Sequence, residues 1–429
     1  MSTTAAQSLL IRHGLVIDPG RINEQADLLI RDGKIAAVGK DLPATQRVDV
    51  LDATGLWVLP GFVDLHVHLR EPGFEYQETI QTGTAAAAAG GFTSICCMPN
   101  TLPVNDSKSI TEFILDRAKS EGLVRVYPIG AITKRSEGKE LSEYAELKDA
   151  GCVAVSDDGK PVMHGMVMRR ALEYARTFDL PVVDHCECLH LSEGGVAHEG
   201  LVATELGLHG MPSAAEDVMV ARNLELAELT GSKLHLAHLS TAGSTRMVRE
   251  AKTRGVSVTA EACPHHFMLT EEAVREFNTN AKMNPPLRAR RDVEAIRAAL
   301  KDGTIDAIAT DHAPHAVYEK QREFEFAPFG IVGLETALGL SLSLVEEGIL
   351  TVEEVIRLLT SGPAKAFGLP RGTLAVGSDA DIAVVDPVAQ WVVDPEQFKS
   401  KGRNTPFGGW KLKGRVVKTF VGGKMVYQV

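Results

Sequence analysis

Two histidines, His66 and His68, lie two positions apart at the end of an apolar run, and Arg70 follows at the same spacing. Side chains alternate between the two faces of a β-strand, so these three residues should leave one face of the expected strand. Imidazoles bind divalent metals, and a guanidinium pairs with a carboxylate through two hydrogen bonds. The segment therefore predicts one wall of a metal site that receives an anion.

Further residues that can bind metals or anions close other apolar runs. They are Asn100, Asp157, Asp158, His185, His238, Asp311 and His312. Taken singly, each has a plainer explanation, because Asp-Gly favours turns and an isolated buried histidine is often structural. These plainer explanations do not account for the position of the residues, which all follow the same end of successive expected strands. The set as a whole therefore favours a catalytic metal centre, with Zn²⁺ as the first candidate.

The apolar runs that carry these residues alternate with helical patterns. Strand-like runs are expected at 62–65, 92–98, 124–129, 152–155, 181–183, 234–237, 256–260 and 305–309. Eight such strands with helices between most of them predict a (β/α)8 TIM-type barrel, whose active site lies at the carboxyl ends of the strands. A doubly wound open sheet is the alternative fold. It is disfavoured because no glycine-rich phosphate loop follows the first strand.

Both ends of the chain contain short strand-like runs separated by tight turns, such as the one at Asp32 and Gly33. We expect residues 1–59 and 367–429 to form one small β-sandwich domain. The catalytic barrel would then occupy residues 60–366.

Bulk properties narrow the class of protein further. A formal net charge of −11 argues against a general nucleic-acid binder. The apolar stretches are too short to span a membrane, and the first residues lack a signal-peptide core. None of the six cysteines falls in a CxxC pair, which favours free thiols in a reducing compartment. We therefore expect a cytoplasmic protein without a membrane partner.

Seven segments resemble those of the dihydroorotases, within the amidohydrolase superfamily of metal-dependent barrels. They are DLHVHLREPG at 64–73, MPNT at 98–101, SDDG at 156–159, DHCE at 184–187, AHLS at 237–240, KMNPPLR at 282–288 and TDHAPH at 310–315. The resemblance extends through essentially the whole chain, and all seven segments occur in the family's order.

The resemblance implies a set of ligands for one or two Zn²⁺ ions per chain. These are His66, His68 and Asp311 for one ion, His185 and His238 for a second, and Asp158 as a bridge between them. Many relatives bridge with a carbamylated lysine, and an aspartate there matches a bacterial class with a carboxylate bridge. The choice of Asp158 over Asp157 rests on the family motif and on the turn at Gly159.

The resemblance also implies the substrate contacts. Arg70, Asn100, Asn284 and His315 would hold a free carboxylate, His68 would border the substrate, and Phe329 and Gly330 would meet a pyrimidine ring through their backbone. His265 and His266 follow the seventh strand at the same end, and we expect them to line the mouth without binding a metal.

The implied activity is that of a cyclic amidohydrolase, the reversible cyclisation of N-carbamoyl-L-aspartate to (S)-dihydroorotate plus water in pyrimidine (UMP) biosynthesis. A hydroxide generated at the metal would attack the ring amide, with Asp311 as general base and then acid. An allantoinase or a dihydropyrimidinase-like enzyme is the alternative, disfavoured by Arg70 and by the missing bridging lysine. A non-catalytic partner of aspartate transcarbamoylase is a further alternative, disfavoured because every ligand is present. A homodimer and a complex with that transferase follow from family analogy alone.

Overall fold

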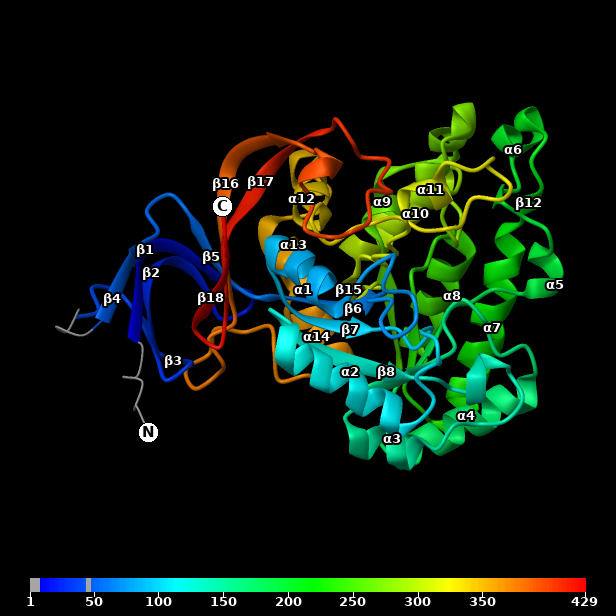
Figure 1. The fold of residues 1–429 in the computed structure, drawn as a ribbon, viewed down its shortest axis with the longest axis horizontal. Helices are drawn as coiled ribbons and strands as arrows, with labels where there is room; N and C mark the ends of the chain where they lie inside the picture. The colour runs from blue at the N-terminus through cyan, green and yellow to red at the C-terminus, as the bar shows by residue number, and fades with distance from the viewer. Residues whose placement is uncertain (1–7, 44–47) are drawn as a thin grey trace.

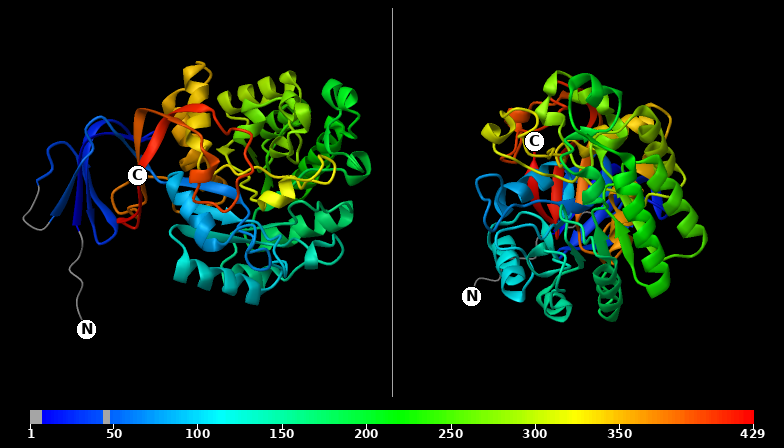
Figure 2. Two further views of the ribbon diagram at one scale, coloured as in Figure 1. Left: turned by 45° about the horizontal axis from the view of Figure 1, so that its top comes forward. Right: turned by 90° about the vertical axis from the view of Figure 1, so that its right-hand side faces the viewer.

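The computed structural model describes residues 8–43 and 48–429, and two large β-sheets organise this part of the chain. One sheet contains strands from both chain ends, and the other is surrounded by helices (Figure 1). The left view of Figure 2 shows the sheet of the chain ends projecting from one end of the helical body.

The helix-surrounded sheet is a parallel barrel. Its strands are β6 (Phe62–Val67), β7 (Phe92–Cys97), β8 (Arg125–Gly130), β9 (Ala154–Ser156), β10 (Val182–Asp184), β13 (Leu234–Leu236), β14 (Val258–Ala262) and β15 (Ala307–Ile308). These eight strands pair in chain order, and a parallel bridge between Val67 and His312 joins the two edges. Each expected run overlaps one of these strands, so the predicted (β/α)8 barrel is confirmed.

Helices connect the strands of the barrel. They are α1 (Ile80–Ala89), α2 (Lys108–Glu121), α3 (Tyr144–Ala150), α4 (Gly165–Thr177), α7 (Ser213–Thr230), α8 (Ala242–Thr253) and α10 (Arg290–Lys301), followed after β15 by α12 (Ala337–Glu346), α13 (Val352–Leu359) and α14 (Ser361–Ala366). Shorter elements at the strand ends are α5 (Leu189–Ser192), β11 (Ala197–His198), α6 (Leu201–Leu206), β12 (Gly210–Met211), α9 (Pro264–Met268) and α11 (Val317–Lys320).

Helix α1 illustrates how the sequence positions these elements. Thr79 begins the helix by accepting a hydrogen bond from the backbone N–H of Thr82, and the helix buries three alanines, Ala86 to Ala88. Gly91 then turns the chain into β7 with a φ of +86°, and a Cβ there would lie 2.8 Å from the Phe62 ring. Only glycine fits this turn without strain.

The second large sheet is mixed and joins both ends of the chain. Its strands are β1 (Ser8–Asp18), β2 (Ile22–Arg31), β3 (Lys34–Gly39), β4 (Val48–Asp52), β5 (Trp57–Pro60), β16 (Ile382–Val392), β17 (Lys411–Val421) and β18 (Lys424–Gln428). Strand β5 pairs antiparallel with β16, which fastens the first part of the chain to the last. The predicted joining of the two ends is confirmed, while the exact domain boundaries at 59/60 and 366/367 stay a prediction.

Charged residues connect this terminal sheet to the amino end of the barrel strands. Arg125, at the start of β8, lies 2.8 Å from Asp381 and 3.1 Å from Asp379. Lys34 lies 2.7 Å from Asp379, and Arg371 also donates to Asp379. Each carboxylate at this junction therefore has a cationic partner.

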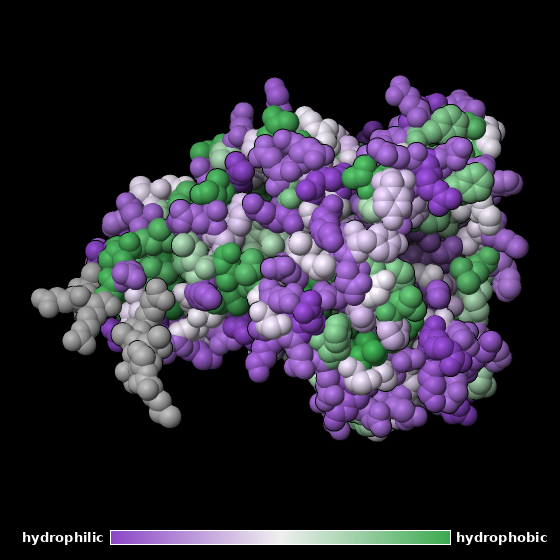
Figure 3. Space-filling model, in the orientation of Figure 1, coloured by the Kyte–Doolittle hydropathy of each residue, from purple (hydrophilic) through white to green (hydrophobic). Residues whose placement is uncertain are grey.

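The surface differs between the two parts of the molecule. Hydrophobic side chains gather over the terminal sheet in the view of Figure 3, whereas the barrel surface in that view is mainly hydrophilic. Exposed apolar residues of the sheet include Val50, Val388 and Met425. Among the described residues, the helices are all too short or too polar to cross a membrane.

Candidate metal centre

Six residues meet at the carboxyl ends of five barrel strands. His66 lies on β6 and His68 just after it, Asp158 follows β9, His185 follows β10, His238 follows β13, and Asp311 follows β15. All six are buried, with at most 7% of any one exposed. The barrel therefore brings together residues that the sequence separates by up to 245 positions.

Asp158 lies between the histidines. Its Oδ1 is 3.4 Å from Nε2 of His66 and 3.7 Å from Nε2 of His238, and its Oδ2 is 3.6 Å from Nε2 of His68. The neighbouring Asp157 turns away, because the backbone N–H of Thr133 donates to its Oδ1 at 3.0 Å and the Thr133 hydroxyl to its Oδ2. Of the two aspartates, Asp158 is the one available to a metal.

Asp311 completes the group. Its Oδ1 lies 3.0 Å from Nε2 of His68 and 3.4 Å from Nε2 of His66. Three overlapping sets each place their ligand atoms within 4.8 Å of one another: His66, His238 and Asp311; His66, His68 and Asp158; and Asp158, His185 and His238. Overlapping triads of this kind can hold one or two ions with shared ligands.

The polar atoms of this centre fit a divalent cation. Among the described residues, Nε2 of His66 and Oδ1 of Asp158 are buried without a hydrogen-bond partner, although unpaired buried polar atoms are costly. Burial opposes a charge on His66, yet Asp311 and Asp158 raise its pKa well above the usual value. A positive charge is therefore favoured where these atoms meet, and imidazoles with carboxylates suit zinc.

Two further carboxylates orient the histidines from behind. Nδ1 of His66 lies 2.9 Å from Glu261, and Nε2 of His185 lies 2.9 Å from Glu187. Although burial opposes it, hydrogen bonds from His235 and His66 hold the pKa of Glu261 at about 2, so the imidazoles donate to an ionised carboxylate. Each histidine thereby presents its other nitrogen to the centre, and carboxylates orient metal-binding imidazoles in this way in known metal sites.

Sequence reasoning gave these two glutamates no role. Glu187 lies inside the DHCE segment but had no assigned partner, and Glu261 lies on β14, which is otherwise apolar or small. A fully buried glutamate in an apolar strand is unusual unless it is paired. That pattern was the available signal for Glu261.

The backbone is strained at three residues of the site. Arg70, His238 and Asp311 have φ values of 62°, 33° and 45°, in the region that non-glycine residues rarely adopt. Such conformations cost roughly 1–3 kcal/mol each and persist where the surrounding structure fixes them. Their concentration here marks the mouth of the barrel as a functional region.

A cavity of about 240 Å³ opens onto these residues. All of the site residues expected from the sequence, except His66, line it: His68, Arg70, Asn100, Asp158, His185, His238, Asn284, Asp311, His315, Phe329 and Gly330. His66 lies behind this lining, fully buried. His312, also considered a candidate, instead contacts Glu78 at 3.3 Å.

The polar wall of the cavity is held in place by hydrogen bonds. Nη2 of Arg70 lies 3.4 Å from Nε2 of His315, which lies 2.8 Å from the Phe329 carbonyl. Lys320 donates to the carbonyls of Pro328 at 2.8 Å and Gly330 at 3.1 Å. Burial lowers the pKa of Lys320 to about 7. The sequence did not predict that Lys320 holds these carbonyls, because its neighbours in the sequence are mostly charged or polar.

A (β/α)8 barrel with a His-x-His pair on its first strand, and further histidines and aspartates at later strand ends, defines a metal-dependent hydrolase of the amidohydrolase type. The family model described as "Dihydro-orotase-like" matches residues 55–244. Dihydroorotase of Syntrophus aciditrophicus is 57% identical over 422 residues, which cover 98% of this chain and 99% of the relative. Dihydroorotase of Anaeromyxobacter dehalogenans is also 57% identical, and 98% of each chain is covered. This chain therefore belongs to the dihydroorotase family, and the resemblance of the seven segments is confirmed.

Solved structures of similar fold carry different names. L-hydantoinase (dihydropyrimidinase) from Arthrobacter aurescens has a TM-score of 0.88 and 26% identity, covering 98% of this chain and 96% of the other. Dihydropyrimidinase from Brevibacillus agri has a TM-score of 0.86 and 26% identity, covering 98% and 95%. The barrel and its terminal sheet are thus shared with enzymes named for other cyclic substrates.

Proposed function

We propose that this chain is a dihydroorotase that interconverts N-carbamoyl-L-aspartate and (S)-dihydroorotate, the third step of pyrimidine biosynthesis. The observation that carries the proposal is that Arg70 and the candidate metal centre line the same cavity. A guanidinium there recognises a substrate that bears a free carboxylate beside its cyclic amide. The 57% identity to proteins named dihydroorotase supports the same reaction.

The proposal includes one or two Zn²⁺ ions per chain. His66, His68 and Asp311 would hold one ion, His185 and His238 a second, and Asp158, which lies within 4 Å of each histidine, would bridge them. When bound, the metal supplies Lewis acidity, which polarises the amide carbonyl and lowers the pKa of a water to about 7 in the zinc case.

Asp311 is the residue that we assign to proton transfer. Although burial opposes it, the nearby His66 and His68 hold the pKa of the Asp311 carboxyl below its usual range, so it is a base at neutral pH. In hydrolysis it accepts a proton from the attacking water and returns that proton to the departing ring nitrogen. In ring closure it takes the proton from the same nitrogen and gives it to the departing hydroxide, which leaves as water.

Arg70, Asn100, Asn284 and His315 would hold the substrate carboxylate. Both asparagines also contact groups of the metal centre: Oδ1 of Asn100 lies 2.9 Å from Nδ1 of His68, and Asn284 donates to Glu187 at 2.9 Å. Substrate binding and ligand orientation are therefore mechanically linked. This arrangement favours one substrate pose over the metal centre.

The backbone at Phe329 and Gly330 would meet the ring of the substrate. Gly330 has a φ of +148°, and a Cβ there would lie 2.7 Å from the Ala313 carbonyl and 2.8 Å from the His315 ring. Only glycine allows the chain to pass this close to His315. A side chain at this position would displace a group that we assign to carboxylate binding.

A hydantoinase- or allantoinase-like enzyme is the second candidate, favoured by the structural neighbours named dihydropyrimidinase and hydantoinase. Hydrolysis of dihydroorotate, dihydrouracil and allantoin by the metal-loaded enzyme distinguishes the two. We expect dihydroorotate to be preferred about 10²-fold or more, because hydrogen bonds to a charged group contribute about 1.5–3 kcal/mol each. Preference for either uncharged substrate would overturn the proposal, and inactivity of the fully loaded protein would favour the non-catalytic alternative.

Analogy with the family is the basis for the partners and location that we propose. We propose a homodimer, an association with aspartate transcarbamoylase, and a cytoplasmic location that agrees with six free cysteines. Light scattering after size-exclusion chromatography, with and without the transferase, tests the first two. A monomeric mass at micromolar concentration would contradict the dimer, and unchanged elution with the transferase would contradict the complex.

A further inference from the structure

A second group of metal-binding side chains lies where β14 passes into α9. Cys263, His265 and His266 offer one sulfur and two nitrogens within 4.8 Å of one another. The three residues are buried, at 0%, 1% and 3% exposure. None of them belongs to the six residues of the candidate metal centre. The sequence predicted that His265 and His266 bind no metal, so a cation here would reverse that prediction.

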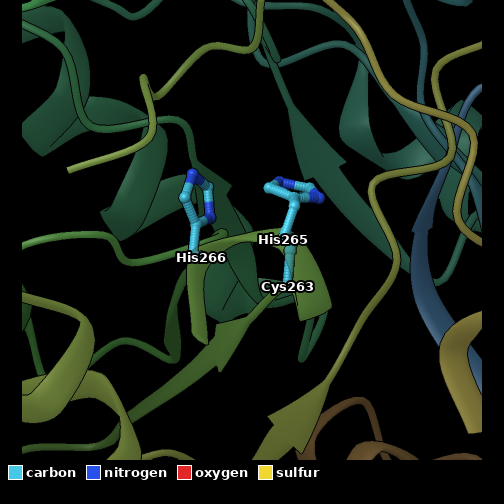
Figure 4. Close-up of side chains that lie close together, drawn as sticks. All are labelled: Cys263, His265 and His266. Carbon is cyan, nitrogen blue, oxygen red and sulfur yellow. The ribbon is translucent and has the colours of Figure 1, made fainter. Parts of the chain in front are cut away.

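The two imidazoles have unused nitrogens. Nε2 of His265 and Nδ1 of His266 are buried without a hydrogen-bond partner among the described residues. Figure 4 shows both rings extending in the same direction from this short segment, and their centroids are 4.3 Å apart at an angle of 64°. Two orphaned nitrogens beside a thiol are costly unless another group occupies the space between them.

The tautomer of His266 prepares it to bind a cation. Its Nε2 lies 2.9 Å from the Pro285 carbonyl, which can only accept, so Nε2 carries the proton. In the neutral ring, Nδ1 then has a free lone pair. A histidine whose one nitrogen donates to a backbone carbonyl while the other points at a ligand site is the usual arrangement around zinc.

We propose that Cys263, His265 and His266 form a further cation site, buried and built from residues other than the six of the candidate metal centre, for a divalent ion of the zinc class. A thiolate with two imidazoles is a donor set of zinc sites, and a water can supply a fourth ligand. The ion would fasten the end of β14 to α9. The site would therefore be structural, and it requires no residue of the reaction.

Cobalt substitution tests the site in the whole enzyme. The catalytic centre offers only nitrogen and oxygen donors, so absorption from thiolate-to-cobalt charge transfer reports on a cysteine ligand alone. We expect this absorption in the Co²⁺-loaded wild type and its loss in Cys263→Ser, together with one cobalt fewer per chain. Cys186→Ser is the matched control, because Cys186 is buried beside His185, and it should keep both the absorption and the cobalt.

Two results would overturn the proposal. One is a cobalt-loaded wild-type enzyme that shows no thiolate-to-cobalt absorption. That result would mean that a water or a shared proton fills the space between the side chains, and it can be obtained without any variant. The other is an unchanged cobalt content in Cys263→Ser. His265→Asn keeps the thiol and should also lose one cobalt per chain, so it serves if Cys263→Ser does not fold.

Discussion

The aspartates at the two ends of the barrel have different partners. At the amino end, where the terminal sheet attaches, Asp381 lies 2.8 Å from Arg125, and Asp379 lies 2.7 Å from Lys34. At the carboxyl end, Asp158 faces imidazoles and one of its oxygens lacks a hydrogen-bond partner among the described residues. Both ends carry aspartates, but those of the amino end pair with lysine and arginine, whereas Asp158 at the carboxyl end faces imidazoles.

The difference separates stability from function. Ion pairs at the amino end connect the two sheets, and they require no bound ion to balance their charges. At the mouth, buried carboxylates, orphaned nitrogens and strained backbone at Asp311 and His238 cost free energy that the fold alone does not recover. We infer that the mouth is built for a cation and a substrate, and the predictions below test this division.

Removing the carboxylate at the mouth should have the largest effect. Asp311→Asn should lower kcat for dihydroorotate at least about 10³-fold, because the amide cannot accept and return the proton. The variant should keep its unfolding temperature within a few degrees. Asp306→Asn is the control at the opposite end of β15, where Asp306 pairs with Lys252 at 2.7 Å. That control should lose stability and keep kcat, and normal turnover in Asp311→Asn would contradict the assignment.

Removing the Arg70 guanidinium should have the second largest effect on activity. Arg70→Met should lower kcat/KM for dihydroorotate about 10²-fold, because charge-assisted hydrogen bonds to the substrate carboxylate are lost. Steady-state kinetics measure this. Arg135→Met changes an exposed arginine on the loop after β8 and should have little effect. Equal kinetics for the two variants would remove Arg70 from the substrate site.

Removing the charge beside the candidate ligand His185 should have a moderate effect, on the affinity for the metal. Glu187→Gln removes the charge that orients His185, and should weaken metal binding about 10–100-fold. Competition with a coloured chelator measures the metal affinity. Glu193→Gln, at an exposed position at the end of α5, is the control. Unchanged affinity in Glu187→Gln would mean that His185 is not a ligand.

Breaking an ion pair between the terminal sheet and the barrel should have the smallest effect, which would be on stability, and should leave kcat unchanged. Asp379→Asn should lower the free energy of unfolding by about 1 kcal/mol, since its partly exposed pairs are screened by solvent. Denaturant unfolding at pH 7 measures this loss. Glu24→Gln, in the exposed pair with Lys40, should change stability less. A large loss of kcat in Asp379→Asn would break the division between the two ends.

The junction also has a pH dependence of definite sign. The hydrogen bond from Lys34, together with Arg371, holds the pKa of Asp379 at about 2 in the folded protein. The unfolded value is about 3.9, so the stabilisation is present above pH ~4 and is lost as the pH falls towards 2. The stability difference between wild type and Asp379→Asn should therefore shrink over that interval. A difference that is constant down to pH 2 would contradict it.

Much of the fold and the candidate site could be predicted from the sequence, because the carboxyl ends of all strands of a parallel barrel lie at the same mouth. The His-x-His pair, Asp158, His185, His238 and Asp311 each close an apolar run, which is a local signal. The choice of Asp158 over Asp157 rested on the family motif and the turn at Gly159, and its physical reason, the hydrogen bonds from Thr133 to Asp157, appears only in the folded chain. Strand β15 spans only Ala307–Ile308 within the expected run 305–309, and His312 then forms isolated parallel bridges to Val67 and Ile331.

Other features depend on contacts that no local pattern encodes. Lys320 is buried by carbonyls of its own loop, and Glu261 is recognisable only once His66 and His235 lie beside it. The orphaned nitrogens of His265 and His266 depend on the path of the chain near Pro285. Motifs identify the residues that we propose for the reaction, whereas their supporting partners are recognised only from the packing of the folded chain.

Removing and restoring metal is the most direct test of the central claim that the mouth of the barrel holds a cation for dihydroorotate hydrolysis. The enzyme would be stripped by a chelator, checked for residual metal by elemental analysis, and assayed for dihydroorotate hydrolysis before and after Zn²⁺ is returned. We predict that activity falls to background in the stripped protein and returns with added zinc. Full activity in protein verified to contain no metal would contradict the account.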